Sequence, residues 1–135
     1  MNIRATSNFR PGNVAAIQEG ITRRVITAVT RGSELVLNSA LGAVPVDTGE
    51  LQSSGHMTVT LEGQIVTGRI IFDADHAAYV EFGTGIRGAA SPGAGKGIAY
   101  SSTWRGMPAQ PYIRPALDSN RREIVGEFRE QGFKV

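Results

Sequence analysis

Apolar residues recur at helical spacing through the first third of the chain. They are Val14, Ile17, Ile21, Val25, Ala28, Val29, Leu35 and Val36, and polar residues largely occupy the opposite face. This pattern predicts a long helix from Asn13, acting as the N-cap, to about Leu41, with Gly42 as the stop. Because glycine is a poor helix former, we also expect a kink or break near Gly32-Ser33.

An alternation of apolar and polar residues follows the helical pattern. It predicts two strands, His56–Thr60 and Gln64–Phe72, joined as a hairpin through a turn at Glu62-Gly63. The segment Ile70-Ile71-Phe72 is continuously apolar, so we expect that end of the second strand to be covered on both faces.

The second half of the chain predicts two further helices. A short one spans His76–Phe82, with the aromatic side chains of Tyr79 and Phe82 available to the core. A longer one spans Pro115–Gln131, and its incomplete apolar stripe must rely on tertiary packing. Residues 133–135 are expected to add an edge strand.

Two segments lack any period. Glycines interrupt residues 86–106, which predicts a long mobile loop, with a short strand at Ile98–Trp104 and Trp104 as an anchor inside the fold or across an interface. Turn-forming residues crowd residues 1–12, which predicts a flexible arm.

Composition limits the possible classes. A length of 135 residues predicts a single domain spanning 1–135, and 41% hydrophobic residues suffice for a modest core. The net charge is only +2, and the basic residues are spread out, which does not favour a nucleic-acid binder. The chain has no cysteine, and no apolar run approaches the ~18 residues of a membrane span, so we expect no membrane association.

Candidate chemical motifs are weak. Asp47-Thr48-Gly49 shares its letters with aspartic proteases, which need a second carboxylate, so we favour Asp47 as a cap for a turn around Glu50–Ser53. Gly93–Gly97 resembles a phosphate-binding loop but has glycine where that motif needs a hydroxyl residue.

Four polar residues close together raise the possibility of a metal site. Asp73, Asp75, His76 and Glu81 lie within nine residues of one another. The stronger interpretation is that Asp73 or Asp75 caps the short helix. We expect no metal and no cofactor. Without a nucleophile and base in a recognisable arrangement, we also expect no enzymatic activity.

Three sequence blocks resemble a known family. They are Val44-Pro45-Val46-Asp47-Thr48-Gly49-Glu50-Leu51, Tyr79-Val80-Glu81-Phe82-Gly83-Thr84-Gly85 and Pro108-Ala109-Gln110-Pro111-Tyr112-Ile113-Arg114-Pro115-Ala116-Leu117. In this order they resemble the small tail-completion or head–tail joining proteins of long-tailed bacteriophages, across roughly residues 14–130. Tyr112-Ile113 replaces a more usual Phe-Leu pair, and Ser53-Ser54-Gly55 lacks a common basic residue.

The resemblance implies both a fold and a function. The fold would be α+β, with a long N-terminal and a C-terminal helix packed on a small, mainly antiparallel sheet. The protein would form a homo-oligomeric, hexameric ring at the neck of the virion, completing the tail and joining it to the head after assembly in the host cytoplasm. Its partners would be the tail terminator or tail tube and head–neck proteins, with genomic DNA passing through the lumen without sequence-specific binding. The alternatives are a tail terminator, a head-closure adaptor or a stopper, and, outside that class, a small nucleic-acid-binding protein.

The resemblance also implies fold-defining and contact-making roles for the motif residues. These are Asp47, Thr48, Gly49, Tyr79, Glu81, Phe82, Gly83, Thr84, Gly85, Pro108, Gln110, Pro111, Tyr112, Arg114 and Pro115. The glycines at 83 and 85 permit a sharp turn or a close approach to another backbone. Glu81 and Arg114 are predicted to form a charge-assisted pair that ties the short helix to the start of the last one.

Overall fold

A 33-residue helix, α1, runs through most of the molecule. The computed structural model describes the backbone from Pro11 onward and side chains from Val14 onward, and α1 spans Pro11–Ala43 without a break. The predicted arm therefore lies outside the described residues, except that Pro11 and Gly12 begin the helix. Asn13 lies within α1, so its prediction as the N-cap was wrong.

The break predicted at Gly32-Ser33 was also wrong, and packing explains why. A Cβ at Gly32 would lie 3.4 Å from the side chain of Ile124, so the missing side chain lets a C-terminal helix approach closely. Ser33 is buried against the hairpin at Gly68. Tertiary contacts on both sides of α1 thus outweigh the poor helix propensity of glycine.

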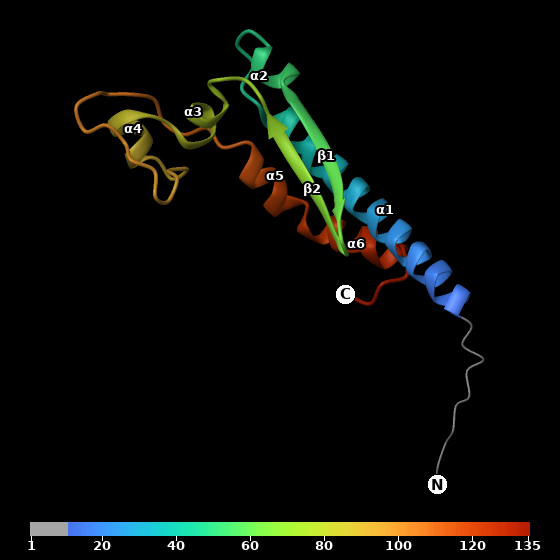
Figure 1. Cartoon of the computed structure of the whole chain (residues 1–135). Helices are drawn as coiled ribbons and strands as arrows, with labels where there is room; N and C mark the ends of the chain where they lie inside the picture. Colours follow the sequence, from blue (N-terminus) through green and yellow to red (C-terminus); the bar gives the residue numbers. More distant parts are fainter. Residues whose placement is uncertain (1–10) are drawn as a thin grey trace.

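The predicted hairpin is present and lies along α1 (Figure 1). Strands β1 (Gly55–Glu62) and β2 (Ile65–Phe72) pair antiparallel, with Gly55 opposite Phe72 and Glu62 opposite Ile65. The turn is therefore Gly63-Gln64, one residue later than expected. Glycine is suited to this place because the φ of Gly63 is +61°.

The predicted C-terminal helix is divided into α5 (Ile113–Ser119) and α6 (Arg121–Glu130). The division falls at Asn120, whose side-chain amide donates to the carbonyl of Ala116 and to Ser39 Oγ on α1, both at 2.7 Å. An asparagine amide that bonds backbone locally competes with helix continuation. The edge strand expected at residues 133–135 is absent from this described segment, because Phe133 instead packs edge-on against Phe128, with a centroid distance of 6.1 Å.

The core lies at one end of the long helix. Its buried residues are Val36, Ala40, Val44, Leu51, Ala77, Val80, Tyr112 and Ala116. Tyr112 is fully buried and meets Phe72 edge-on at a centroid distance of 4.8 Å. The C-terminal half of α1, the open end of the hairpin, α3 and α5 meet here. The fold is thus α+β, with a long N-terminal helix, C-terminal helices and a small antiparallel sheet, as expected.

Three short helices complete the chain: α2 (Glu50–Ser53), α3 (Ala77–Phe82) and α4 (Gly85–Ala90). The first two match the predicted turn and helix, but the Tyr79 side chain is 58% exposed and does not enter the core. Helix α4 lies in the segment expected to lack regular structure, and Ile98–Trp104 forms no strand. We call residues 83–111 the lobe. The lobe projects away from α1 and the hairpin (Figure 1). We call α1, the hairpin, α2, α3, α5 and α6 together the body.

Candidate interaction site

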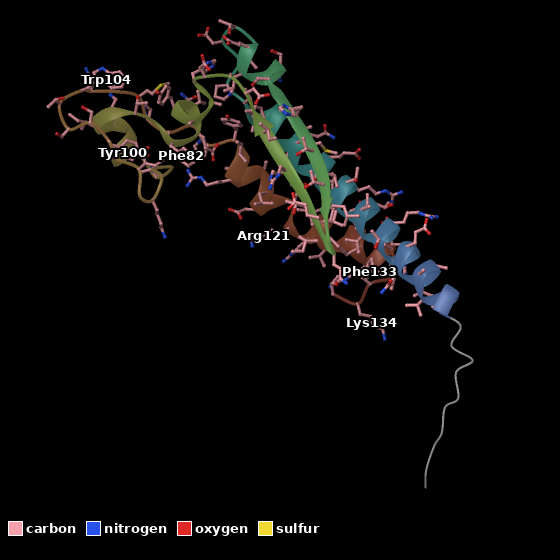
Figure 2. All side chains as sticks on the ribbon, viewed as in Figure 1. Phe82, Tyr100, Trp104, Arg121, Phe133 and Lys134 are labelled. Atoms are coloured by element: carbon pink, nitrogen blue, oxygen red, sulfur yellow. The ribbon has the colours of Figure 1, made fainter. Side chains whose placement is uncertain are left out.

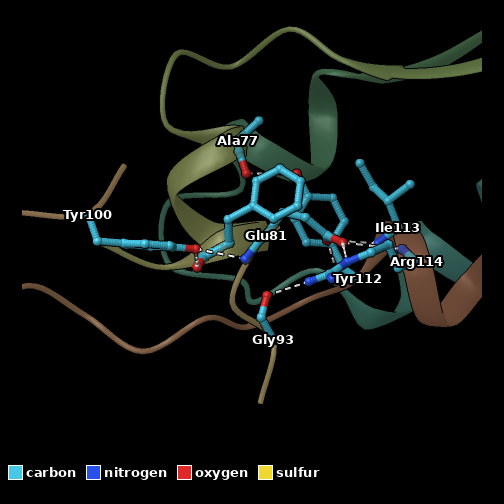
Figure 3. Close-up of polar contacts among 9 residues, drawn as sticks. Ala77, Glu81, Gly93, Tyr100, Tyr112, Ile113 and Arg114 are labelled. Atoms are coloured by element: carbon cyan, nitrogen blue, oxygen red, sulfur yellow. Dashed lines mark hydrogen bonds and ion pairs between the residues drawn. The ribbon is translucent and has the colours of Figure 1, made fainter. Parts of the chain in front are cut away.

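Glu81 is the centre of the junction between the body and the lobe. The residue is 3% exposed, yet its carboxylate accepts four hydrogen bonds. The N–H groups of Tyr112 (2.7 Å), Ile113 (3.0 Å) and Arg114 (3.3 Å) donate to it, as does Arg114 Nε at 3.1 Å (Figure 3). Glu81 therefore caps the first turn of α5 from another element and satisfies N–H groups that a helix start leaves free. The predicted Glu81–Arg114 pair is confirmed.

The charge state of this centre follows from its hydrogen bonds. Burial by itself raises the pKa of Glu81, but the N–H groups of Ile113, Tyr112 and Arg114 and the Arg114 side chain together lower it below the ordinary 4.5. Burial, followed by the negative charge of Glu81, raises the pKa of Tyr112 to about 12. The carboxylate is thus held ionised beside a neutral phenol.

Arg114 extends the junction into the lobe. Its guanidinium lies over the ring of Phe82, 5.1 Å from the centroid, and donates to the carbonyl of Gly93. The same side chain bonds Glu81, so Arg114 connects α3, α5 and the lobe (Figure 3). Its planar fork of donors suits this threefold role, which lysine cannot reproduce.

Hydrogen bonds also fasten the lobe to itself. Tyr100 Oη donates to the carbonyl of Phe82 at 2.7 Å and accepts from the N–H of Gly95 at 2.8 Å. Thr84 and Met107 exchange two backbone hydrogen bonds, at 2.9 and 3.1 Å. Irregular backbone is therefore paired rather than left to solvent. The mobility expected for residues 86–106 stays a prediction.

The predicted close approach at Gly83 and Gly85 is confirmed. Their φ angles are +74° and +59°, which side chains rarely tolerate. A Cβ at Gly83 would lie 2.6 Å from the N of Ala109, and one at Gly85 would lie 2.9 Å from the Cα of Gly106. Gly83 thus lets its block meet the block at Pro108–Leu117 backbone to backbone, and Gly85 lets the chain approach Trp104 and Gly106, just before that block.

A cleft of about 390 Å³ lies where all three blocks converge, and we refer to it as the cleft below. Its lining residues are Pro45, Asp47, Thr48, Gly49, Glu50, Leu51, His76, Val80, Met107 and Gln110. The N–H of Gln110 donates to the carbonyl of Val80 at 2.8 Å, which joins the second block to the third. The carboxylates of Asp47 and Glu50 have no ion-pair partner among the residues described.

The capping predictions were wrong. Gly49, with φ +80°, precedes α2, and Thr48 Oγ1 rather than Asp47 accepts from the N–H of Glu50, at 3.4 Å. Asp73 does not cap α3 but pairs with His56, with 3.3 Å between Asp73 Oδ2 and Nδ1. His76 is the residue before α3 and makes no side-chain cap bond. In both α2 and α3, the N-cap residue makes no side-chain hydrogen bond, and a backbone turn alone leads into the helix.

The remaining motif residues differ in whether they contribute to the junction. Pro115 lies in the first turn of α5, where its missing N–H leaves no bond unmade. Tyr79 and Pro108 are exposed. Sequence reasoning missed Ser91, whose Oγ accepts from the N–H of Ala109 at 3.0 Å, and Tyr100. A lone tyrosine in a glycine-rich stretch was the signal available for Tyr100.

Among residues 14–135, no three His, Asp or Glu side chains gather in a way that could hold a metal ion. From Pro11 onward, no helix has the length and apolar character needed to cross a membrane. The junction joins backbone elements, and the cleft and the exposed apolar side chains of the lobe lie at the surface.

Comparison with known proteins identifies the class. The model of the family described as "Bacteriophage HK97-gp10, putative tail-component" matches residues 12–83, more than half of the chain. The chain belongs to this family, and it is a structural tail protein of a bacteriophage virion. The match ends at Gly83, where the lobe begins. Comparisons with curated proteins and with solved structures found no match.

Proposed function

We propose that this protein completes the phage tail and joins it to the head at the neck, as a non-enzymatic ring of six copies around the DNA channel. The observation that carries the proposal is that large apolar side chains of the lobe are exposed. Trp104 is 58% exposed and Ile86 is 50% exposed, although hydrogen bonds fasten the backbone around them. Large apolar side chains held in place in water are typical of protein–protein contacts.

A second apolar surface lies at the other end of the molecule. Ile17 and Ile21, in the N-terminal half of α1, and Leu61 and Ile65, beside the hairpin turn, are all exposed. A groove of about 430 Å³ runs between them, lined by Gln18, Ile21, Thr22, Val25, Leu61, Gly63, Gln64 and Val66. Two separate surfaces allow one copy to contact different neighbours, and contacts between unlike surfaces generate rings when the rotation closes.

The charge distribution is compatible with DNA passing through such a ring. The whole chain carries a net charge of +2, and its basic residues are spread along the sequence. A modest excess of positive charge without a base-reading motif favours contact with phosphates over sequence-specific binding.

The test combines particle composition with the phenotype of loss. We expect the chain in purified virions, and electron microscopy of the isolated oligomer to show a closed ring with a central hole. Infected cells in which the phage lacks this chain should accumulate filled heads and finished tails that do not join. Tails of irregular length would instead support a terminator, and heads that lose DNA would support a head-closure adaptor or stopper. Absence of the chain from virions would overturn the proposal.

A further inference from the structure

The cleft and the outer part of the lobe are complementary surfaces. We propose that the cleft of one copy receives the lobe tip of a second copy. The lobe tip consists of Ile86, Arg87, Trp104 and Arg105. This inference rests on the proposed ring and names the contact that closes it.

The lobe tip is built as one unit. The N–H of Ile86 donates to the carbonyl of Trp104 at 2.9 Å, and the N–H of Arg87 donates to that of Arg105 at 3.0 Å. These bonds place two apolar side chains beside two guanidinium groups. Within the described residues, neither Arg87 nor Arg105 has an ion-pair partner. Aromatic residues and arginine are the residue types enriched at protein interfaces.

The cleft offers the matching features. Asp47 and Glu50 present two carboxylates without ion-pair partners in the described part of the chain. Val46 and Tyr79 add apolar surface next to the cleft. Val46, which is 66% exposed, follows the lining residue Pro45, and Tyr79 precedes the lining residue Val80. Apolar side chains can therefore be buried at the centre of the contact while opposite charges meet at its rim, which favours correct orientation and fast association.

The occupant must come from another copy. Met107 lines the cleft, and its paired backbone bonds with Thr84 separate the cleft from the lobe tip of the same chain. Figure 2 shows Trp104 on the outer side of the lobe, away from the helices of the body. A basic tip on one side and an acidic cleft on the other make an unlike-surface contact, the kind that repeats around a ring.

Disulfide trapping tests this contact directly, because the chain has no cysteine of its own. The double variant Val46→Cys/Thr103→Cys places one thiol beside the cleft and one beside the tip. After mild oxidation of virions carrying it, a denaturing gel without reductant should show a ladder of cross-linked chains. Each single variant should remain monomeric on the same gel. Mixed virions that contain both single variants should yield dimers.

The outcomes separate the contact from the proposed function. If the wild-type chain is present in virions but the double variant gives only monomers, the contact is wrong and the neck assignment stands. If the wild-type chain is absent from virions, both the contact and the neck assignment are wrong. A ladder supports both.

Charge reversal gives an independent readout. Arg105→Glu and Asp47→Arg should each lower incorporation into virions by about tenfold, and the double reversal should restore most of it. Arg122→Glu, on α6 and exposed, is the matched control and should have little effect. Circular dichroism confirms folding of each variant. Equal effects of Arg105→Glu and Arg122→Glu, or no restoration in the double variant, would overturn the contact.

Discussion

The body and the lobe of this protein reach order by different means. In the body, periodic apolar residues bury against one another around α1, and the polar contacts of Glu81 are confined to the place where α3 meets α5. In the lobe, residues 83–111 have no period, and order comes from specific bonds made by Tyr100, by the paired backbone of Thr84 and Met107, and by Arg114 at the junction. Burial is non-directional, whereas these bonds need particular atoms in particular places. The lobe should therefore be far more sensitive to single substitutions than its exposure suggests.

The largest expected effect comes from removing the junction carboxylate. Glu81→Ala leaves three N–H groups and a guanidinium without their acceptor, and we expect a loss of about 3 kcal/mol in the free energy of unfolding. Urea denaturation measures it. Glu123→Ala, an exposed carboxylate on α6, is the control and should cost under about 0.5 kcal/mol. Similar losses for the two variants would refute the central role of Glu81.

Gly83→Ala should have the next largest effect. The new Cβ meets the backbone of Ala109 at 2.6 Å, and the φ of +74° is strained for alanine, so we expect a loss of about 2 kcal/mol or more. Gly97 also has positive φ, +77°, but nothing lies within 4 Å of its Cβ position. Gly97→Ala therefore reports the strain alone, at about 1 kcal/mol. If thermal unfolding shows equal losses, close packing does not matter at Gly83.

Acid should weaken the junction to a smaller degree. Because folding lowers the pKa of Glu81 from 4.5, its contribution is fully present above pH 4.5 and is lost as the pH falls through the folded-state pKa. The loss is smaller than in Glu81→Ala since a protonated carboxyl still accepts hydrogen bonds. Stability measured from pH 6 to 3 should fall more steeply in the wild type than in Glu81→Gln. Parallel curves would contradict this.

The smallest expected effect has the opposite sign and lies in the body. Gly20 is in α1, and nothing lies within 4 Å of its Cβ position. Gly20→Ala should raise the free energy of unfolding by about 1 kcal/mol, because alanine is the better helix former. Urea denaturation of Gly20→Ala and Gly83→Ala under the same conditions compares a glycine of the body with one of the lobe. Destabilisation by Gly20→Ala would show that α1 needs this glycine.

Local patterns predicted the body well. Helical spacing predicted α1, alternation predicted the hairpin, and the glycine at 83 marked the end of α3, because each signal is carried by neighbouring residues. The Glu81–Arg114 pair was also predicted, since both residues lie in recognisable blocks. Some errors were the strands expected at 98–104 and 133–135 and the missed helix α4. The others fell at helix starts and breaks, at Asn13, Gly32, Asp47 and Asp73. There, contacts with distant segments or the backbone itself replaced the expected cap.

The sequence by itself determined the elements of the body, the class of fold and the family, because periodicity and motif order are properties of the chain. Only the tertiary structure decided that Glu81 caps α5, that Arg114 and Tyr100 fasten the lobe, and that three separate blocks share one cleft. Those contacts join residues 18 to 33 positions apart. No local pattern encodes such contacts, since their geometry exists only after α1, the hairpin and α5 have packed together.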